Sequence, residues 1–185
     1  MSEKISGNLI IIGGAEDKKG KKEILKRVAK YIDPNKDKML IATIATEYPE
    51  KSYENYKTIF NNLGIKNIEK LDISVREEAF EKENIDLIKE ADLLFFTGGD
   101  QLRITSMIGG SPVYDAIKEL CINGGIIAGT SAGASVMSDT MIVEGNDEES
   151  PHKCTLKMSP GLGLVKNIII DQHFAQRGRI GRLLT

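Results

Sequence analysis

The sequence predicts an α/β fold with a mainly parallel sheet that helices cover on both faces. Short apolar runs alternate with amphipathic stretches along most of the 185 residues. The runs are apolar throughout, as expected for strands that are buried on both faces. Three of them end in turns that contain glycine, and parallel sheets carry their sites just beyond the carboxyl ends of their strands.

The elements can be placed in chain order from these patterns. Apolar runs predict strands at 9–12, 39–45, 68–73, 92–97, 125–129 and 168–170. Apolar residues at helical spacing predict helices around 24–32, 53–63, 79–88 and 113–121, and the tail from Phe174 has a helical pattern. The segment 141–164 is less regular and holds an acidic run, 144–149.

Composition excludes several function classes. The net charge is −2 and there is no Trp, so neither a nucleic-acid partner nor a base-stacking surface is expected. No apolar stretch is long enough to cross a membrane, and the N-terminus does not resemble a signal peptide. Cys121 and Cys154 form neither a metal-ligand spacing nor a disulfide framework. We expect a soluble, cytoplasmic protein without a metal or an organic cofactor.

The turn at Gly129–Gly133 carries the clearest chemical signal. It matches G-x-S-x-G between a predicted strand and a predicted helix, the arrangement of a nucleophile elbow. Such a turn would expose the Ser131 hydroxyl as a nucleophile and would point the Ala132 N–H toward the same space. The alternative is a phosphate-binding turn, which can have the same composition.

A serine nucleophile needs a base and donors for its oxyanion. His173 follows an apolar run and should lie at a strand end near Ser131, whereas His152 lies in a polar loop. We therefore predict His173 as the base. Gly98-Gly99 could supply a second oxyanion donor, although a structural turn would explain the two glycines equally well.

Four segments together resemble the serine peptidase family that contains cyanophycinase and peptidase E. They are 13–17 (GGAED), 97–101 (TGGDQ), 129–134 (GTSAGA) and 171–179 (DQHFAQRGR). They occur in the family's order over nearly the whole chain, and the last segment and the Gln after G-G-D are particular to cyanophycinase. The resemblance implies a flavodoxin-like three-layer sandwich of the class I glutamine-amidotransferase type. It also implies Ser131 as nucleophile, His173 as base, and the N–H groups of Gly99 and Ala132 as the oxyanion hole.

The resemblance further implies a substrate and a partner. The substrate would be cyanophycin (multi-L-arginyl-poly-L-aspartate), cleaved to β-aspartyl-arginine dipeptides, and the enzyme would be a homodimer. Six residues fall where the family places its substrate contacts: Gln101, Asp171, Gln172, Arg177, Arg179 and Arg182. Arginine can hold a carboxylate with two parallel hydrogen bonds, and Asp171 could pair with a guanidinium.

One part of the family pattern is missing. The family's third triad member is a glutamate in a segment that this chain does not contain, so we expect residues 1–185 to be a single peptidase domain that lacks its C-terminal part. Glu144 and Asp147 are candidates for an acid within the chain. A peptidase E-like aspartyl dipeptidase and a non-catalytic module that binds a small ligand remain the alternatives. Glutamine amidotransfer would need a cysteine at position 131.

Overall fold

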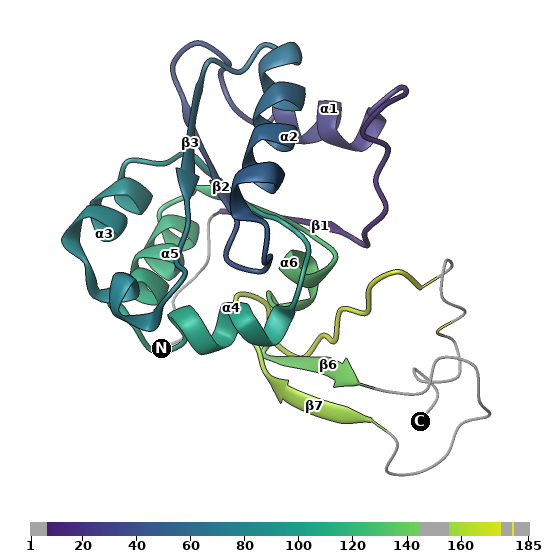
Figure 1. Ribbon diagram of the computed structural model, residues 1–185, viewed down its shortest axis with the longest axis vertical. Coiled ribbons are helices and arrows are strands. Elements are labelled where there is room, and N and C mark those ends of the chain that lie inside the picture. The colour runs from purple at the N-terminus through teal and green to yellow at the C-terminus, as the bar shows by residue number, and fades with distance from the viewer. Residues whose placement is uncertain (1–6, 145–155, 175–178, 180–185) are drawn as a thin grey trace.

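The computed structural model describes residues 7–144, 156–174 and 179, and its centre is a parallel sheet (Figure 1). Five strands pair in the order β1-β5-β4-β2-β3, and all four pairings are parallel. Their bounds are β1 (Asn8–Ile12), β2 (Lys38–Ala42), β3 (Asn67–Leu71), β4 (Leu93–Phe96) and β5 (Ile126–Thr130). The predicted α/β sandwich is confirmed.

Helices cover both faces of this sheet. They are α1 (Glu23–Ala29), α2 (Pro49–Asn62), the 3-10 helix η1 (Arg76–Phe80), α3 (Lys82–Lys89), α4 (Gln101–Ile108), α5 (Pro112–Ile122) and the short α6 (Ala132–Ser135). Alternate residues of β2 divide between two cores. Met39 and Ile41 pack with α1 and α2, whereas Leu40 and Ala42 pack with α3, α4 and α5. The strands are apolar throughout because both of their faces are buried.

A second, two-stranded sheet lies beside α4 (Figure 1). It pairs β6 (Thr140–Glu144) antiparallel with β7 (Lys157–Pro160). The sequence patterns did not indicate this hairpin, and they did not indicate α4. The amide Nε2 of Gln101, in the first turn of α4, donates to the Ile142 carbonyl at 3.1 Å and so ties the hairpin to the main domain.

The predicted strand at 168–170 is wrong. These residues lie outside every strand, and serine hydroxyl groups take the place of a strand partner. The Ile170 N–H donates to Ser138 Oγ at 3.1 Å, and Ser135 Oγ donates to the Ile170 carbonyl at 3.2 Å. The segment therefore crosses over α6 and delivers residues 171–173 to the strand ends.

The strand order brings three turns together. β5 lies between β1 and β4, with Thr130 in register with Ile12 and Gly129 in register with Phe96. The turns that follow these strands therefore meet at one edge of the sheet, as expected for parallel strands.

Candidate active site

Ser131 occupies a tight turn between β5 and α6. Its φ is 54° and its ψ is −114°, a conformation that side-chain-bearing residues seldom adopt. The turn closes only because its neighbours are glycines. A Cβ on Gly129 would lie 2.2 Å from the Gly133 carbonyl oxygen, and a Cβ on Gly133 would lie 2.6 Å from Phe96 Cβ. The two glycines of the G-x-S-x-G pattern are thus required because the turn has no room for a Cβ atom at either position.

His173 lies against the Ser131 hydroxyl. The distance from Ser131 Oγ to His173 Nε2 is 2.9 Å. The turn after β1 holds the histidine in place, since the His173 N–H donates to the Gly13 carbonyl at 2.7 Å. Gly14 borders the imidazole directly, and a Cβ there would lie 2.7 Å from Nε2. The two predicted reacting groups are therefore within hydrogen-bond reach, as base-assisted attack by a serine requires.

Gln172 is a second partner of the serine. Ser131 Oγ donates to Gln172 Oε1 at 3.1 Å. A hydroxyl has one proton, so it can donate either to this amide oxygen or to His173 Nε2. Only donation to His173 Nε2 prepares the Ser131 oxygen for nucleophilic attack. Gln172 and His173 therefore compete for the same proton.

The turn after β4 passes beside the serine. A Cβ on Gly98 would lie 3.3 Å from Ser131 Cβ. At Gly99 φ is 149°, and a Cβ there would lie 2.0 Å from the Ala45 carbonyl oxygen, so only glycine fits. The Ser131 N–H already donates to the Ile12 carbonyl at 3.0 Å. The N–H groups of Gly99 and Ala132 stay the predicted oxyanion donors, and α6 begins at Ala132.

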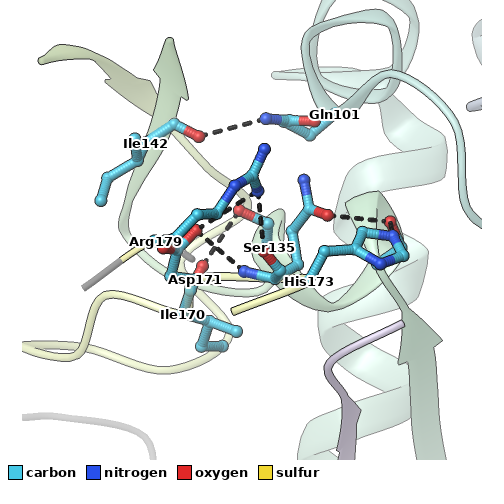
Figure 2. Close-up of polar contacts among 9 residues, drawn as sticks. Gln101, Ser135, Ile142, Ile170, Asp171, His173 and Arg179 are labelled. Carbon is cyan, nitrogen blue, oxygen red and sulfur yellow. Dashed lines mark hydrogen bonds and ion pairs between the residues drawn. The ribbon is translucent and has the colours of Figure 1, made fainter. Parts of the chain in front are cut away.

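Other predicted substrate residues make contacts inside the protein. Figure 2 shows Arg179 pointing toward the loop that carries His173. Its Nη1 donates to the Gln172 carbonyl at 2.7 Å and lies 3.7 Å from Asp171 Oδ1. The side chains of Arg179 and Asp171 are 6% and 4% exposed, so the pair braces this loop from within. Arg177 and Arg182 lie outside the described residues.

The candidates for an internal acid are only partly described. Glu144 ends β6 at the surface, where its carboxylate pairs with Lys157 Nζ at 2.5 Å. Asp147, His152 and Cys154 lie outside the described residues.

Cys121 is buried in the core, and burial raises the pKa of its thiol. Within 7–144, 156–174 and 179, no cluster of three His, Cys, Asp or Glu side chains could hold a metal ion. None of the helices in these same ranges is long and apolar enough to cross a membrane.

A cavity of about 450 Å³ opens beside Ser131 and His173. Its lining also includes Glu16 and Lys18 from the turn after β1, and Tyr56 from α2. Sequence analysis missed these residues as site residues. The sequence places Tyr56 only within the predicted helix at 53–63, and Glu16 only within the segment 13–17 (GGAED). A glutamate placed directly after a glycine-rich strand end was the available signal.

Glu16 is a buried carboxylate. It accepts hydrogen bonds from Tyr56 Oη at 2.5 Å and from Thr130 Oγ1 at 2.6 Å. Burial alone would raise the pKa of Glu16, but the hydrogen bonds from Thr130 and Tyr56 outweigh it and the pKa lies below the ordinary value. Burial and the nearby Glu16 carboxylate raise the pKa of Tyr56, which therefore stays neutral. Thr130, the residue before Ser131, is thus anchored to the Glu16 carboxylate.

Comparisons with known proteins found a family model and curated relatives that match this chain. The model of peptidase family S51 matches residues 9–184. A Geminocystis herdmanii protein named cyanophycinase is 34% identical over 100% of this chain, which spans 68% of that protein. A Nostoc protein of the same name is 36% identical over 96% of the chain and 60% of its own length. The chain therefore spans about two thirds or less of the length of these relatives.

Two solved structures show the same fold. A peptidase from an acI-B1 Actinobacterium superposes with a TM-score of 0.70 and 27% identity, over 94% of this chain and 71% of the other. A putative peptidase E protein from Listeria monocytogenes EGD-e gives a TM-score of 0.66 at 18% identity, over 96% of this chain and 87% of the other. At that identity the second likeness concerns the fold alone.

Proposed function

The chain belongs to peptidase family S51, and from this premise we propose that it is a serine exopeptidase that hydrolyses cyanophycin to β-aspartyl-arginine dipeptides. The observation that carries this proposal is the 2.9 Å contact between Ser131 Oγ and His173 Nε2 at the edge of a cavity. The similarity to the Geminocystis and Nostoc cyanophycinases supports the substrate.

Acyl transfer would follow from these positions. The Ser131 oxygen attacks the carbonyl carbon of a backbone peptide bond, and its proton passes to His173 Nε2. The N–H groups of Gly99 and Ala132 donate to the oxyanion of the tetrahedral intermediate. His173 then returns the proton to the leaving amine, which leaves an acyl group on Ser131. Water, deprotonated by His173, releases this acyl group and restores the hydroxyl.

Substrate recognition would involve the residues around this centre. We propose that Gln101, Gln172, Arg177 and Arg182 contact the aspartate backbone and its arginine branches. Asp171 and Arg179 already pair with each other, and they would contribute through the loop that they brace. A β-linked arginine offers both a guanidinium and a free α-carboxylate, so a site with polar and charged groups of both signs suits it.

We also propose that the enzyme works as a cytoplasmic homodimer. The family resemblance supports the dimer, and a reducing compartment fits the free, buried Cys121. Light scattering coupled to size-exclusion chromatography would measure the mass. A monomer at the concentration used for activity assays would contradict the dimer.

The direct test is to incubate the protein with insoluble cyanophycin and detect β-aspartyl-arginine by mass spectrometry, with Ser131→Ala as the control. Dipeptide from the wild type alone is the expected result. Dipeptide from both proteins would remove Ser131 from the mechanism. A fluorophosphonate that labels Ser131 without any release of dipeptide would reject cyanophycin as substrate and favour an aspartyl dipeptidase. Failure to label would favour a non-catalytic binding module.

A further inference from the structure

Lys18 lines the same cavity as Ser131 and His173, and it has no part in the proposed acyl-transfer steps. Ser131, His173, Lys18 and Tyr56 all line the cavity of about 450 Å³. Among the residues that the structure describes, the titratable side chains in its lining are Glu16, Lys18, Tyr56 and His173. Tyr56 stays neutral because its pKa is raised, and Lys18 brings an ammonium group to the cavity lining.

Fixed neighbours hold the Lys18 ammonium in place. Its Nζ lies 3.4 Å from Glu16 Oε1 and 4.6 Å from the centre of the Tyr56 ring. Glu16 cannot swing away, because its two carboxylate oxygens also accept hydrogen bonds from Tyr56 and Thr130. The Lys18 side chain is 38% exposed whereas that of Glu16 is 2% exposed. The buried carboxylate thus anchors a cation that still reaches the cavity.

The backbone that carries Lys18 is ordered by its other neighbour. The Asp17 carboxylate accepts hydrogen bonds from the N–H groups of Lys19, Gly20 and Lys22, at 3.0, 2.7 and 3.1 Å. These bonds, led by the one from Gly20, lower the pKa of Asp17 to about 2, so the carboxylate is charged and the turn is held at neutral pH. Glu16 and Asp17, the two residues before Lys18, therefore fix where its side chain is presented.

Lys18 keeps donor capacity for a ligand. An ammonium has three N–H donors, and Glu16 accounts for one direction. Charge-assisted hydrogen bonds from an ammonium favour a carboxylate over a neutral group. The Lys18–Glu16 ion pair has no net charge. It therefore repels neither the carboxylate nor the guanidinium of a substrate that carries both groups. A carboxylate that approaches Ser131 through this cavity would meet Lys18.

We propose that Lys18 is a specificity-determining residue that binds the free α-carboxylate of a substrate arginine while the backbone carbonyl lies on Ser131. This inference rests on the proposed cyanophycin hydrolysis and deepens it. The β-linked arginine of cyanophycin is attached through its α-amino group, so its α-carboxylate is free. Lys18 would hold this group and leave the guanidinium to other residues.

Two short β-aspartyl-arginine oligomers test the assignment, one with free arginine carboxylates and one with carboxamides in their place. With the free carboxylates, Lys18→Gln should raise KM about tenfold and change kcat little, as loss of one charge-assisted hydrogen bond predicts. The wild type should show a similar rise on the carboxamide oligomer, and Lys18→Gln should scarcely distinguish the two. Lys18→Arg should recover part of the preference.

The matched control is Lys57→Gln, which removes a lysine that lies 5.0 Å over the Tyr53 ring on α2. It should leave KM unchanged, and neither variant should alter the labelling rate of Ser131 by a neutral fluorophosphonate. Equal losses by Lys18→Gln on both oligomers, or no loss on either, would overturn the role of Lys18. A wild type that cleaves neither oligomer yet is labelled at Ser131 would overturn the proposed substrate and, with it, this inference.

Discussion

A Cβ atom on Gly14 would lie 2.6 Å from Cε1 of His173, so the turn after β1 touches the imidazole with no room for a side chain. The φ of Gly14 is 101°, which further disfavours any other residue. This contact couples the first strand of the chain to a histidine near its end. It leads to a prediction about the position of the proposed base.

Gly14→Ala should displace the imidazole from Ser131. A misplacement of about 1 Å can cost about 100-fold in rate, and we expect a loss of that size both in turnover and in fluorophosphonate labelling. The neighbouring Gly13→Ala is the control, because a Cβ there meets nothing within 4 Å. If Gly14→Ala retained full labelling, the histidine would not be the group that activates Ser131.

Gln172→Met should separate two effects on Ser131. It removes the amide oxygen that lies 3.1 Å from Oγ, so the hydroxyl can donate only to His173. A net hydrogen bond is worth about 1 kcal/mol, which predicts a rise of about two- to fivefold in labelling by a neutral reagent. Use of the oligomeric substrate should fall, since Gln172 is a proposed substrate contact. A lower labelling rate would show that Gln172 supports the geometry of the serine instead of competing for its proton.

Thr130→Val should lower the free energy of unfolding more at neutral pH than in acid. Thr130 donates to the Glu16 carboxylate at 2.6 Å, and this bond helps to lower the folded-state pKa of Glu16. A lowered pKa contributes stability above the unfolded value of 4.5, and this contribution is lost as the pH falls through the folded value. The destabilisation by Thr130→Val, about 1–3 kcal/mol at pH 7, should therefore shrink in acid. Urea unfolding at pH 7 and at pH 3 would measure it, and a pH-independent loss would contradict the coupling.

The main sheet could be predicted because its signals are local. The residues of β2, β4 and β5 are apolar on both faces, and glycine marks the turns that need positive φ or close approach. The run at 168–170 has the same composition, yet Ile168 and Ile169 are 53% and 43% exposed and make no strand. Composition alone could not distinguish a buried strand from an apolar crossing segment.

The cluster of Glu16, Tyr56 and Thr130 beside the cavity could not be predicted, because these residues are distant from one another in the sequence. Tyr56 and Thr130 lie 40 and 114 residues from Glu16. A sequence with no alignment carries no signal for such pairs. Ser131 and His173 could be paired only because each follows an apolar run, and the strand at 168–170 on which this argument relied for His173 is absent. Side-chain hydroxyls of Ser135 and Ser138 deliver the histidine instead.

Gln101→Ala should weaken substrate use more than it weakens labelling of Ser131. Nε2 of Gln101 is already used by the Ile142 carbonyl, so its amide oxygen is the atom that could meet a substrate. Loss of the contact with β6 should cost about 1 kcal/mol of stability, measured as a lower urea midpoint. Equal losses in substrate use and labelling would assign Gln101 to the structure of the site, and not to its specificity.

Arg179→Met should show the opposite pattern. The guanidinium is buried, donates to the Gln172 carbonyl at 2.7 Å and lies beside Asp171, so its removal takes one charged partner away from the buried Asp171 carboxylate under the loop that carries His173. Breaking a buried pair on one side typically costs about 3–5 kcal/mol, and we expect labelling of Ser131 and hydrolysis to fall together. Arg179→Lys should recover part of both, because an ammonium can still donate to the carbonyl. If labelling by a neutral reagent survived while hydrolysis of the charged oligomer was lost, Arg179 would be a direct substrate contact that leaves its internal partners when substrate binds.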